Sequence, residues 1–401
     1  MEELAMRHVI MAGCDLHDGS MVLKVAVDRG EPERLDFKNT AAGRRTMIAR
    51  LQKRAADLGG ARIVFVYEAS GQGFGLYDEL TGAGVEAHVL APTRIARSVR
   101  HSRQKTDDRD AQQALELVRG YVLAGNALPD VWIPDRQTRD DRELVRMRMD
   151  VGDKITAVKT QVQSLLKRHQ LRRPEATGKG WSVAFRGWLR RLALARADSD
   201  SEPIGPSGRV ALGSLLRQLV GLEAEEGRLD RCLMKLADTA RYAKPLRRMT
   251  ELCGVGVLTA LVFLTEMGDL ARFANRRQIA AYLGLAPSSN ESGEANDRKG
   301  HITHQGSSRV RKVLCQATWA RVRHDPEEKA AYERIKAKNP KKKKIAVVAS
   351  MRRLAVRLFH RGREAIVENS PGSPDTAVQA DRGPIPTGAT KCGCAAGFSK
   401  A

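Results

Sequence analysis

Residues 62–68 read RIVFVYE, a continuous apolar run of strand length that ends in an acid, and three glycines follow at Gly71, Gly73 and Gly75. An apolar run bounded by glycines is typical of a buried strand. Outward from it, shorter apolar runs at 7–15, 21–27 and 85–90 alternate with segments of helical composition at 41–58, 76–80 and 106–118. Because this alternation is typical of α/β folds, the sequence predicts an α/β domain over residues 5–125. The turn sequence Asp18-Gly19-Ser20 joins the first two runs as a β-hairpin, so the sheet is expected to be mixed.

The middle of the chain has a different, helical pattern. Apolar residues recur at steps of three and four from Leu144 to Leu165, and again from Leu212 to Leu236, where Glu226 interrupts the run. Near-heptad spacing is typical of long amphipathic helices that pack on each other or on a second subunit. We therefore expect a helical hairpin or coiled coil over residues 136–245, with an irregular tip within 170–207.

The last part of the chain is expected to form a mainly helical domain over residues 246–367. Gly254-Val255-Gly256 opens an apolar helix, and a second helix is expected near 276–283. Two helices hinged on a Gly-x-Gly turn resemble a helix-hairpin-helix, whose backbone N–H groups can meet phosphates. Residues 368–401 are rich in Gly, Pro, Ser and Ala without an apolar period, which predicts a disordered tail.

The charge balance indicates a polyanionic partner. The 401 residues carry 69 Lys and Arg against 47 Asp and Glu, a formal net charge of +22, and such a surplus neutralises phosphates. Lys341 to Lys344 precede a basic last helix and favour contact with a nucleic-acid backbone. The longest apolar run, about ten residues from Val255 to Leu264, is too short for a membrane helix. The amino terminus has no signal-peptide pattern, so a cytoplasmic protein without a membrane partner is expected.

Four acids occupy positions from which their side chains can converge. Asp15 ends the first strand and Glu68 ends RIVFVYE, while Asp107 and Asp110 lie three apart at the start of a helix. Acids at strand tips point away from the apolar faces of a sheet, and acids three apart share one side of a helix. Such a cluster suits two Mg²⁺ ions, which together clamp the attacking and leaving oxygens of a phosphodiester.

A structural interpretation fits the same residues. Asp107 and Asp110 follow Thr106, a good N-cap, and acids in a first turn stabilise a helix by about 0.3–1 kcal/mol. Asp108 would serve that purpose equally well, and a single acid at the end of a strand is common. The geometric pattern alone leaves both interpretations open.

The order of these motifs resembles the DEDD domain of the transposases of insertion-sequence family one-hundred-ten, which have the Piv DNA invertases as relatives. The match consists of Asp15, of Glu68 within YEASGQGFGLYDEL, and of the string KTDDRDA at 105–111. The resemblance implies an RNase H-like domain similar to RuvC. In that fold the four acids, here Asp15, Glu68, Asp107 and Asp110, would bind divalent metal ions, Mg²⁺ or Mn²⁺.

Residues 252–321 are similar to the second domain of the same family over their whole length. The matching strings include GVG at 254–256, AYLGLAP at 281–287 and SG at 292–293. In the family, the serine of the P-x4-S-G string is the nucleophile. The resemblance therefore assigns that role to Ser292 rather than to Ser288 or Ser289.

The function that this resemblance implies is that of a DNA transposase, which excises and inserts its own mobile element through a phosphoserine step. Its partners would be the element ends and target DNA, a guide RNA encoded by the element, and further copies of the chain in a dimer or tetramer. It would act in a bacterial cytoplasm, associated with the nucleoid. The alternative is a RuvC-like metal-dependent nuclease or junction resolvase that uses only the four acids and forms no covalent adduct. A non-catalytic nucleic-acid-binding relic is disfavoured, because all four acids and Ser292 are present.

Overall fold

The computed structural model describes residues 8–95, 106–194, 204–289, 299–338 and 340–367. The chain divides into two compact units, residues 1–133 and 134–401. The tail predicted to be disordered, 368–401, lies outside the described residues and stays a prediction.

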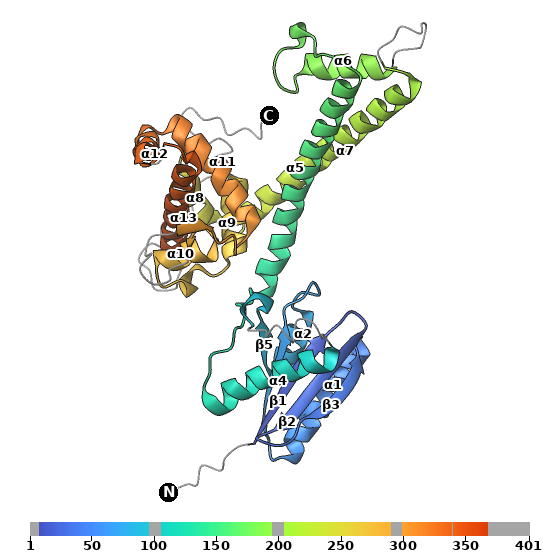
Figure 1. The fold of residues 1–401 in the computed structure, drawn as a ribbon, viewed down its shortest axis with the longest axis vertical. Helices are drawn as coiled ribbons and strands as arrows, with labels where there is room; N and C mark the ends of the chain where they lie inside the picture. Colours follow the sequence, from blue (N-terminus) through green and yellow to red (C-terminus); the bar gives the residue numbers. More distant parts are fainter. Residues whose placement is uncertain (1–7, 96–105, 195–203, 290–298, 339, 368–401) are drawn as a thin grey trace. The chain divides into compact units, whose positions relative to one another are not determined.

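A five-stranded sheet forms the centre of the first unit, in the order β3-β2-β1-β4-β5 (Figure 1). Its strands are β1 (Val9–Leu16), β2 (Ser20–Val27), β3 (Glu33–Lys38), β4 (Arg62–Glu68) and β5 (Glu86–Leu90). β1 and β2 form the predicted hairpin and β2 pairs antiparallel with β3, whereas β1, β4 and β5 run parallel. The prediction of a mixed α/β domain is therefore confirmed.

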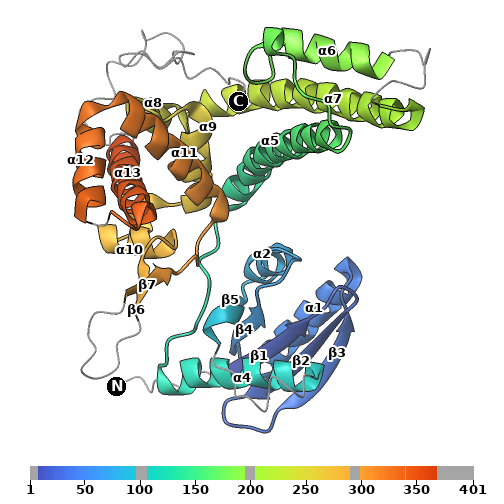
Figure 2. The same ribbon diagram turned by 45° about the horizontal axis from the view of Figure 1, so that its top comes forward.

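Helices cover both faces of this sheet (Figure 1, Figure 2). On one face, α1 (Ala41–Asp57) and α2 (Gly75–Gly82) share a core cluster with Phe65 of β4. On the other face, α4 (Asp107–Ala124) packs Leu115 against Val64 and Val66. A short 3-10 turn, η1 (Pro92–Arg94), follows β5. Burial on both faces explains why residues 63–67, IVFVY, are continuously apolar and do not alternate.

The second unit begins with two long helices, α5 (Arg136–Arg168) and α7 (Pro206–Ala237), which pack side by side (Figure 1). Between them come the 3-10 turn η2 (Glu175–Thr177) and the helix α6 (Val183–Leu194). Residues 183–194 of the tip are therefore a regular helix. Trp181, Phe185 and Leu189 recur every four residues and are buried in the same cluster as α5 and α7, so an amphipathic helix forms there.

Most of the apolar seam between α5 and α7 is buried within the chain itself. Val151, Ile155 and Val162 of α5 share one core cluster with Leu212 and Leu219 of α7. Met147 of α5 is 49% exposed. The seam is therefore covered largely by the chain, and the homo-oligomer stays a prediction.

In the C-terminal part of the second unit, α9 (Val257–Met267) is buried continuously from Ala260 to Met267 and packs against α5, α7 and three further helices of this unit. Gly254, in the Gly-x-Gly turn ahead of α9, has a φ of +76°, and a Cβ there would lie 2.8 Å from the carbonyl oxygen of Ala317. This glycine therefore serves close packing against a neighbouring helix. The other elements are α8 (Ala243–Thr250), η3 (Leu270–Arg272), α10 (Arg276–Tyr282), β6 (Pro287–Ser289), β7 (Lys299–Ile302), α11 (Ser308–His324), α12 (Pro326–Lys338) and α13 (Lys343–Val367).

Ion pairs fasten α5 to these helices. Arg146 pairs with the buried Glu266 of α9 at 2.7 Å, and Asp150 pairs with Arg309 of α11 at 2.8 Å. Burial alone would raise the pKa of Glu266, but the hydrogen bond and the charge of Arg146 hold that pKa below its usual value. The contacts join α5 to the C-terminal helices within one compact unit, and separate domains at 136–245 and 246–367 stay a prediction.

Among the described residues, none of the helices combines the length and the apolar character that crossing a membrane requires.

Candidate active site

Asp15 and Glu68 lie at the carboxyl ends of two neighbouring parallel strands, where Asp15 is the residue before the last of β1 and Glu68 is the last of β4. β1 and β4 are paired as far as Cys14 and Tyr67, and Asp15 and Glu68 are the next residues of the two strands. Both acids are partly exposed. The parallel pairing therefore places them at adjacent strand ends.

α4 supplies Asp107 and Asp110 from its first turn. Its close approach to β1 depends on Gly13, because a Cβ there would lie 2.2 Å from the backbone nitrogen of Leu115 and 2.6 Å from the carbonyl oxygen of Ala111. Ala111 itself is fully buried. Glycine on the strand and alanine on the helix thus allow α4 to pack directly on the strand that carries Asp15.

A further residue at this edge, His17 in the turn between β1 and β2, was not predicted from the sequence. Its Nε2 lies 3.0 Å from Asp15 Oδ2 and 3.3 Å from Asp107 Oδ1. His17 therefore joins the end of β1 to the first turn of α4. The sequence does indicate that His17 lies near Asp15, because residues i and i+2 of an extended chain face the same side.

The donor atoms at this edge suit a divalent cation. One oxygen from Asp15, one oxygen from Asp107 and one ring nitrogen of His17 all lie within 4.8 Å of one another. Carboxylate oxygens are the ligands that Mg²⁺ prefers, and imidazole nitrogen is a common ligand of transition metals. The residues present therefore fit the metal that the DEDD pattern implies.

The charges at this edge act on one another. Burial raises the pKa of Asp15; His17 opposes this, while the negative charges of Asp110 and Asp107 raise the pKa further, so that it lies above its usual value. A cation between the carboxylates would relieve this repulsion. The structure thus brings Asp15, Asp107 and Asp110 within electrostatic reach of one another, and places Glu68 on the adjacent strand end.

Asp108 has a different role from its two neighbours in the first turn. It pairs with Lys24 of β2 at 2.8 Å and with Arg34 of β3 at 3.3 Å, and its pKa is lowered, chiefly by the hydrogen bond from Lys24. Thr106 occupies the N-cap position, but its side chain makes no capping hydrogen bond. Asp108 therefore fastens the start of α4 to the sheet.

Hydrogen bonds link three loops around the same edge. Asn39, between β3 and α1, donates through Nδ2 to the carbonyl oxygen of His17 at 2.7 Å and to Gln72 Oε1 at 2.7 Å. Gln72, in the glycine-rich segment after β4, donates to Asp18 Oδ1 at 3.2 Å. The turn that carries His17 is therefore held by both neighbouring loops.

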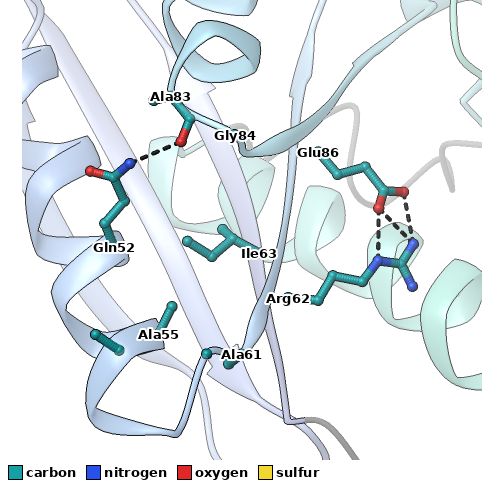
Figure 3. Close-up of a pocket in the computed structure, with 10 residues that line it drawn as sticks. Gln52, Ala55, Ala61, Arg62, Ile63, Ala83, Gly84 and Glu86 are labelled. Carbon is teal, nitrogen blue, oxygen red and sulfur yellow. Dashed lines mark hydrogen bonds and ion pairs between the residues drawn. The ribbon is translucent and has the colours of Figure 1, made fainter.

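A shallow hollow lies at the opposite edge of the sheet, where β4 and β5 begin (Figure 3). Small residues such as Ala55 line much of it. Its charged residues bind each other, with Arg62 Nη2 at 2.7 Å from Glu86 Oε2, and Gln52 donates to the carbonyl oxygen of Ala83 at 2.9 Å. These lining residues are engaged in structural contacts, so the hollow has no evident catalytic group.

In the second unit, β6 and β7 pair antiparallel and bracket the segment 290–298, which contains Ser292. That segment lies outside the described residues, so the structure gives no position for Ser292. Ser288 donates its hydroxyl to the carbonyl oxygen of His301 at 3.0 Å. The Ser288 hydroxyl therefore helps to hold the two strands together.

The chain segments that enter and leave this hairpin are tightly packed. Gly284 has a φ of +64°, and a Cβ on Gly306 would lie 2.1 Å from the carbonyl oxygen of Tyr282. Arg311 of α11 joins the two segments, because its Nη1 donates to the carbonyl oxygens of Leu283 at 3.1 Å and Gly306 at 2.7 Å. The base of the hairpin is thus fixed by residues on both sides of it.

Four exposed lysines, Lys341 to Lys344, gather at the start of α13. Cations at a helix N-terminus oppose the helix dipole, at a cost of about 0.3–1 kcal/mol each. Their placement therefore does not serve the stability of α13 and favours a role in binding an anionic partner.

Comparison with known proteins identifies the family. The model described as "Transposase IS116/IS110/IS902 family" matches residues 246–333, and the transposase model for the DEDD domain of IS110 elements matches residues 12–170. The second match spans the sheet, whose mixed five-stranded order is consistent with a RuvC-like DEDD fold. The chain belongs to the IS110 family of transposases.

Individual relatives are similar along much of the chain. The putative transposase y4qE of Sinorhizobium fredii is 30% identical over 64% of this chain and 58% of its own length. The putative transposase y4rJ of the same organism is 28% identical over 79% of this chain and 82% of its own length. The transposase for insertion sequence element IS1111A of Coxiella burnetii is 24% identical over 65% of this chain and 66% of its own length. Two of these three matches thus span less than two thirds of the relative.

Proposed function

We propose that the protein is the DNA transposase of a bacterial insertion sequence, which cuts and rejoins DNA at the element ends and at a target. The observation that carries the proposal is the close packing of α4 on β1 at Gly13, which brings Asp107 and Asp110 to the strand end that carries Asp15. The same elements lie within the matched DEDD domain.

Asp15, Glu68, Asp107 and Asp110 would hold the divalent metal, Mg²⁺ or Mn²⁺. Two such ions bound at a phosphodiester supply charge stabilisation for the attacking and leaving oxygens. The contribution of the chain is to fix the carboxylates in advance. Gly13 allows the helix to approach, and the ion pair of Asp108 with Lys24 fastens the start of that helix.

Ser292 is the proposed nucleophile. Its Oγ would form an ester with phosphorus while the bond from phosphorus to one sugar oxygen breaks, and that sugar oxygen takes up a proton. A serine hydroxyl needs a base or a metal to attack phosphorus. The engagement of Ser288 with the carbonyl oxygen of His301 supports this assignment, because it commits the nearer hydroxyl to the hairpin.

The net charge of +22 supports nucleic acid as the partner, both DNA and a guide RNA encoded by the element. Pairing with a guide RNA would supply specificity for the sequence. We also propose that recombination, which must hold two duplexes, uses a dimer or tetramer of the chain in the bacterial cytoplasm, at the nucleoid.

Single alanine variants of the four acids test the proposal. Asp15→Ala, Glu68→Ala, Asp107→Ala and Asp110→Ala should each abolish strand cleavage in Mg²⁺, because each removes a metal ligand, while folding and nucleic-acid binding persist. Asp108→Ala is the matched control from the same turn and should retain cleavage. Full recombination by any of the four variants would overturn the metal-site assignment.

A further inference from the structure

Within the described part of the chain, His17 contacts an acid on β1 and an acid on α4 at the proposed metal site. It lies two residues after Asp15 in the chain, and its Nε2 is 3.0 Å from Asp15 Oδ2 and 3.3 Å from Asp107 Oδ1. Its side chain is 43% exposed, so a solvated ion can reach the ring. The DEDD pattern names only acids, and His17 has no role in it.

We propose that His17 Nε2 is a ligand of the divalent cation held by Asp15 and Asp107, and that it makes the site favour Mn²⁺ over Mg²⁺. The proposal rests on the function proposed above and deepens it by assigning a further ligand and a metal preference. It adds a nitrogen to a set of donors that the family pattern describes as carboxylates.

The distances between the donor atoms carry this inference. Ligand atoms held at right angles about 2.1 Å from an octahedral ion lie about 3 Å from each other. The separations of His17 Nε2 from the two carboxylate oxygens, 3.0 and 3.3 Å, match that spacing. With all three donor atoms within 4.8 Å of one another, they can reach a single ion.

The turn that carries the ring is held in place. The backbone N–H of His17 donates to the carbonyl oxygen of Ser20 at 2.9 Å, and the carbonyl oxygen of His17 accepts from Asn39 Nδ2 at 2.7 Å. Both bonds are made by the backbone of His17, and they fix the position of the turn from which the ring reaches Asp15 and Asp107.

The chemistry of the donor set gives the metal preference. Mg²⁺ favours oxygen ligands and keeps several of its waters. Imidazole nitrogen suits first-row transition ions better than it suits Mg²⁺. A site of two carboxylates and one imidazole should therefore gain affinity for Mn²⁺ with little gain for Mg²⁺.

Pulsed electron paramagnetic resonance of the full-length protein, loaded with Mn²⁺ alone and without nucleic acid, tests the proposal. The bound Mn²⁺ should show coupling to an imidazole nitrogen, and this coupling should vanish in His17→Ala and His17→Asn. The matched control is His88→Ala, because His88 also contacts two carboxylates, Glu86 at 3.1 Å and Asp130 at 3.3 Å, but on β5. That variant should keep the signal.

Calorimetric titration of the same proteins gives a second readout. His17→Ala should weaken Mn²⁺ binding at least tenfold, roughly the least that loss of a supporting partner costs a metal site, and should change Mg²⁺ affinity much less. Bound Mn²⁺ without nitrogen coupling in the unaltered protein, or an undiminished signal in His17→Ala, would overturn the proposal.

Asp15→Asn separates this proposal from the proposed function. If Asp15→Asn loses Mn²⁺ binding while His17→Ala keeps both the affinity and the signal, only the role of His17 is refuted. If Asp15→Asn binds Mn²⁺ as tightly as the unaltered protein, or if the unaltered protein binds none, the metal site fails and the role of His17 fails with it.

Discussion

Replacing Gly13 by alanine should move Asp107 and Asp110 away from Asp15, although none of these acids is itself changed. The added Cβ would lie 2.2 Å from the Leu115 nitrogen and 2.7 Å from the Ala114 carbonyl carbon, both of them backbone atoms that cannot rotate away. Carbon contacts are comfortable at about 3.5–4.0 Å, so α4 must retreat from β1 by roughly 1 Å or more. Overpacking of this size costs about 1–3 kcal/mol of the free energy of unfolding.

The retreat of α4 also carries Asp107 and Asp110 away from Asp15. A misplacement of about 1 Å can cost on the order of 10²-fold in rate. We therefore expect Gly13→Ala to lose at least about tenfold in Mn²⁺ affinity, by the same reasoning that applies to a displaced ligand shell, and to lose most strand cleavage. Thermal unfolding, calorimetric titration and a cleavage assay measure the three effects. Gly19→Ala in the adjoining turn is the control, because a Cβ there meets nothing within 4 Å. A Gly13→Ala protein with unchanged melting temperature and metal affinity would refute the reasoning.

Three further predictions concern stability and binding. Glu328 is 4% exposed and contacts Arg321 at 3.2 Å and Arg357 at 2.5 Å. Glu328→Gln should cost about 1.5–3 kcal/mol in urea unfolding, because these charge-assisted contacts are lost while the buried Arg321 keeps Asp325 at 3.3 Å. An equal loss in the exposed neighbour Glu327→Gln would contradict this. Burial acts to raise the pKa of Asp135, but its bonds with Thr138 and Arg241 lower that pKa to about 2. The Asp135 carboxylate therefore stabilises the fold at pH values above its unfolded pKa of about 3.9. The difference in unfolding free energy between the unaltered protein and Asp135→Asn should shrink as the pH falls from about 4 to about 2. A difference that does not change with pH would refute the link between this ionisation and stability. Binding to duplex DNA should weaken steeply with salt, because log K falls by about 0.9 per neutralised phosphate for each tenfold rise in salt concentration. Replacing Lys341 to Lys344 by serine should flatten that slope. An unchanged slope would show that these lysines do not contact the DNA.

Much of the fold was predictable because its elements carry periodic signals. Residues 63–67, IVFVY, are apolar throughout because helices cover both faces of their sheet. The seams of α5 and α7 recur at steps of three and four, apart from the break at Glu226. β3 was not predicted, because Leu35 is the only buried residue of this edge strand.

The four acids of the candidate site could be predicted from the sequence, but the packing contacts that bring them close together could not. Asp15, Glu68, Asp107 and Asp110 end or begin regular elements, so their positions follow from the pattern of strands and helices. The contact of Gly13 with Leu115 joins residues about a hundred positions apart, which no local period records. His17 likewise meets Asp107 only because α4 packs on β1.

The central claim, that the chain breaks DNA through a covalent bond to Ser292, is tested most directly by identifying the attached residue. The purified protein would be incubated with its element ends, the flanking RNA and Mg²⁺, denatured and digested, and the peptide that carries nucleotide would be sequenced by mass spectrometry. The account predicts nucleotide on Ser292, no adduct in Ser292→Ala or Asp15→Ala, and an undiminished adduct in Ser288→Ala. Nucleotide on another residue, an adduct that survives in Ser292→Ala, or metal-dependent cutting without any adduct would contradict it, and the last result would favour a junction resolvase.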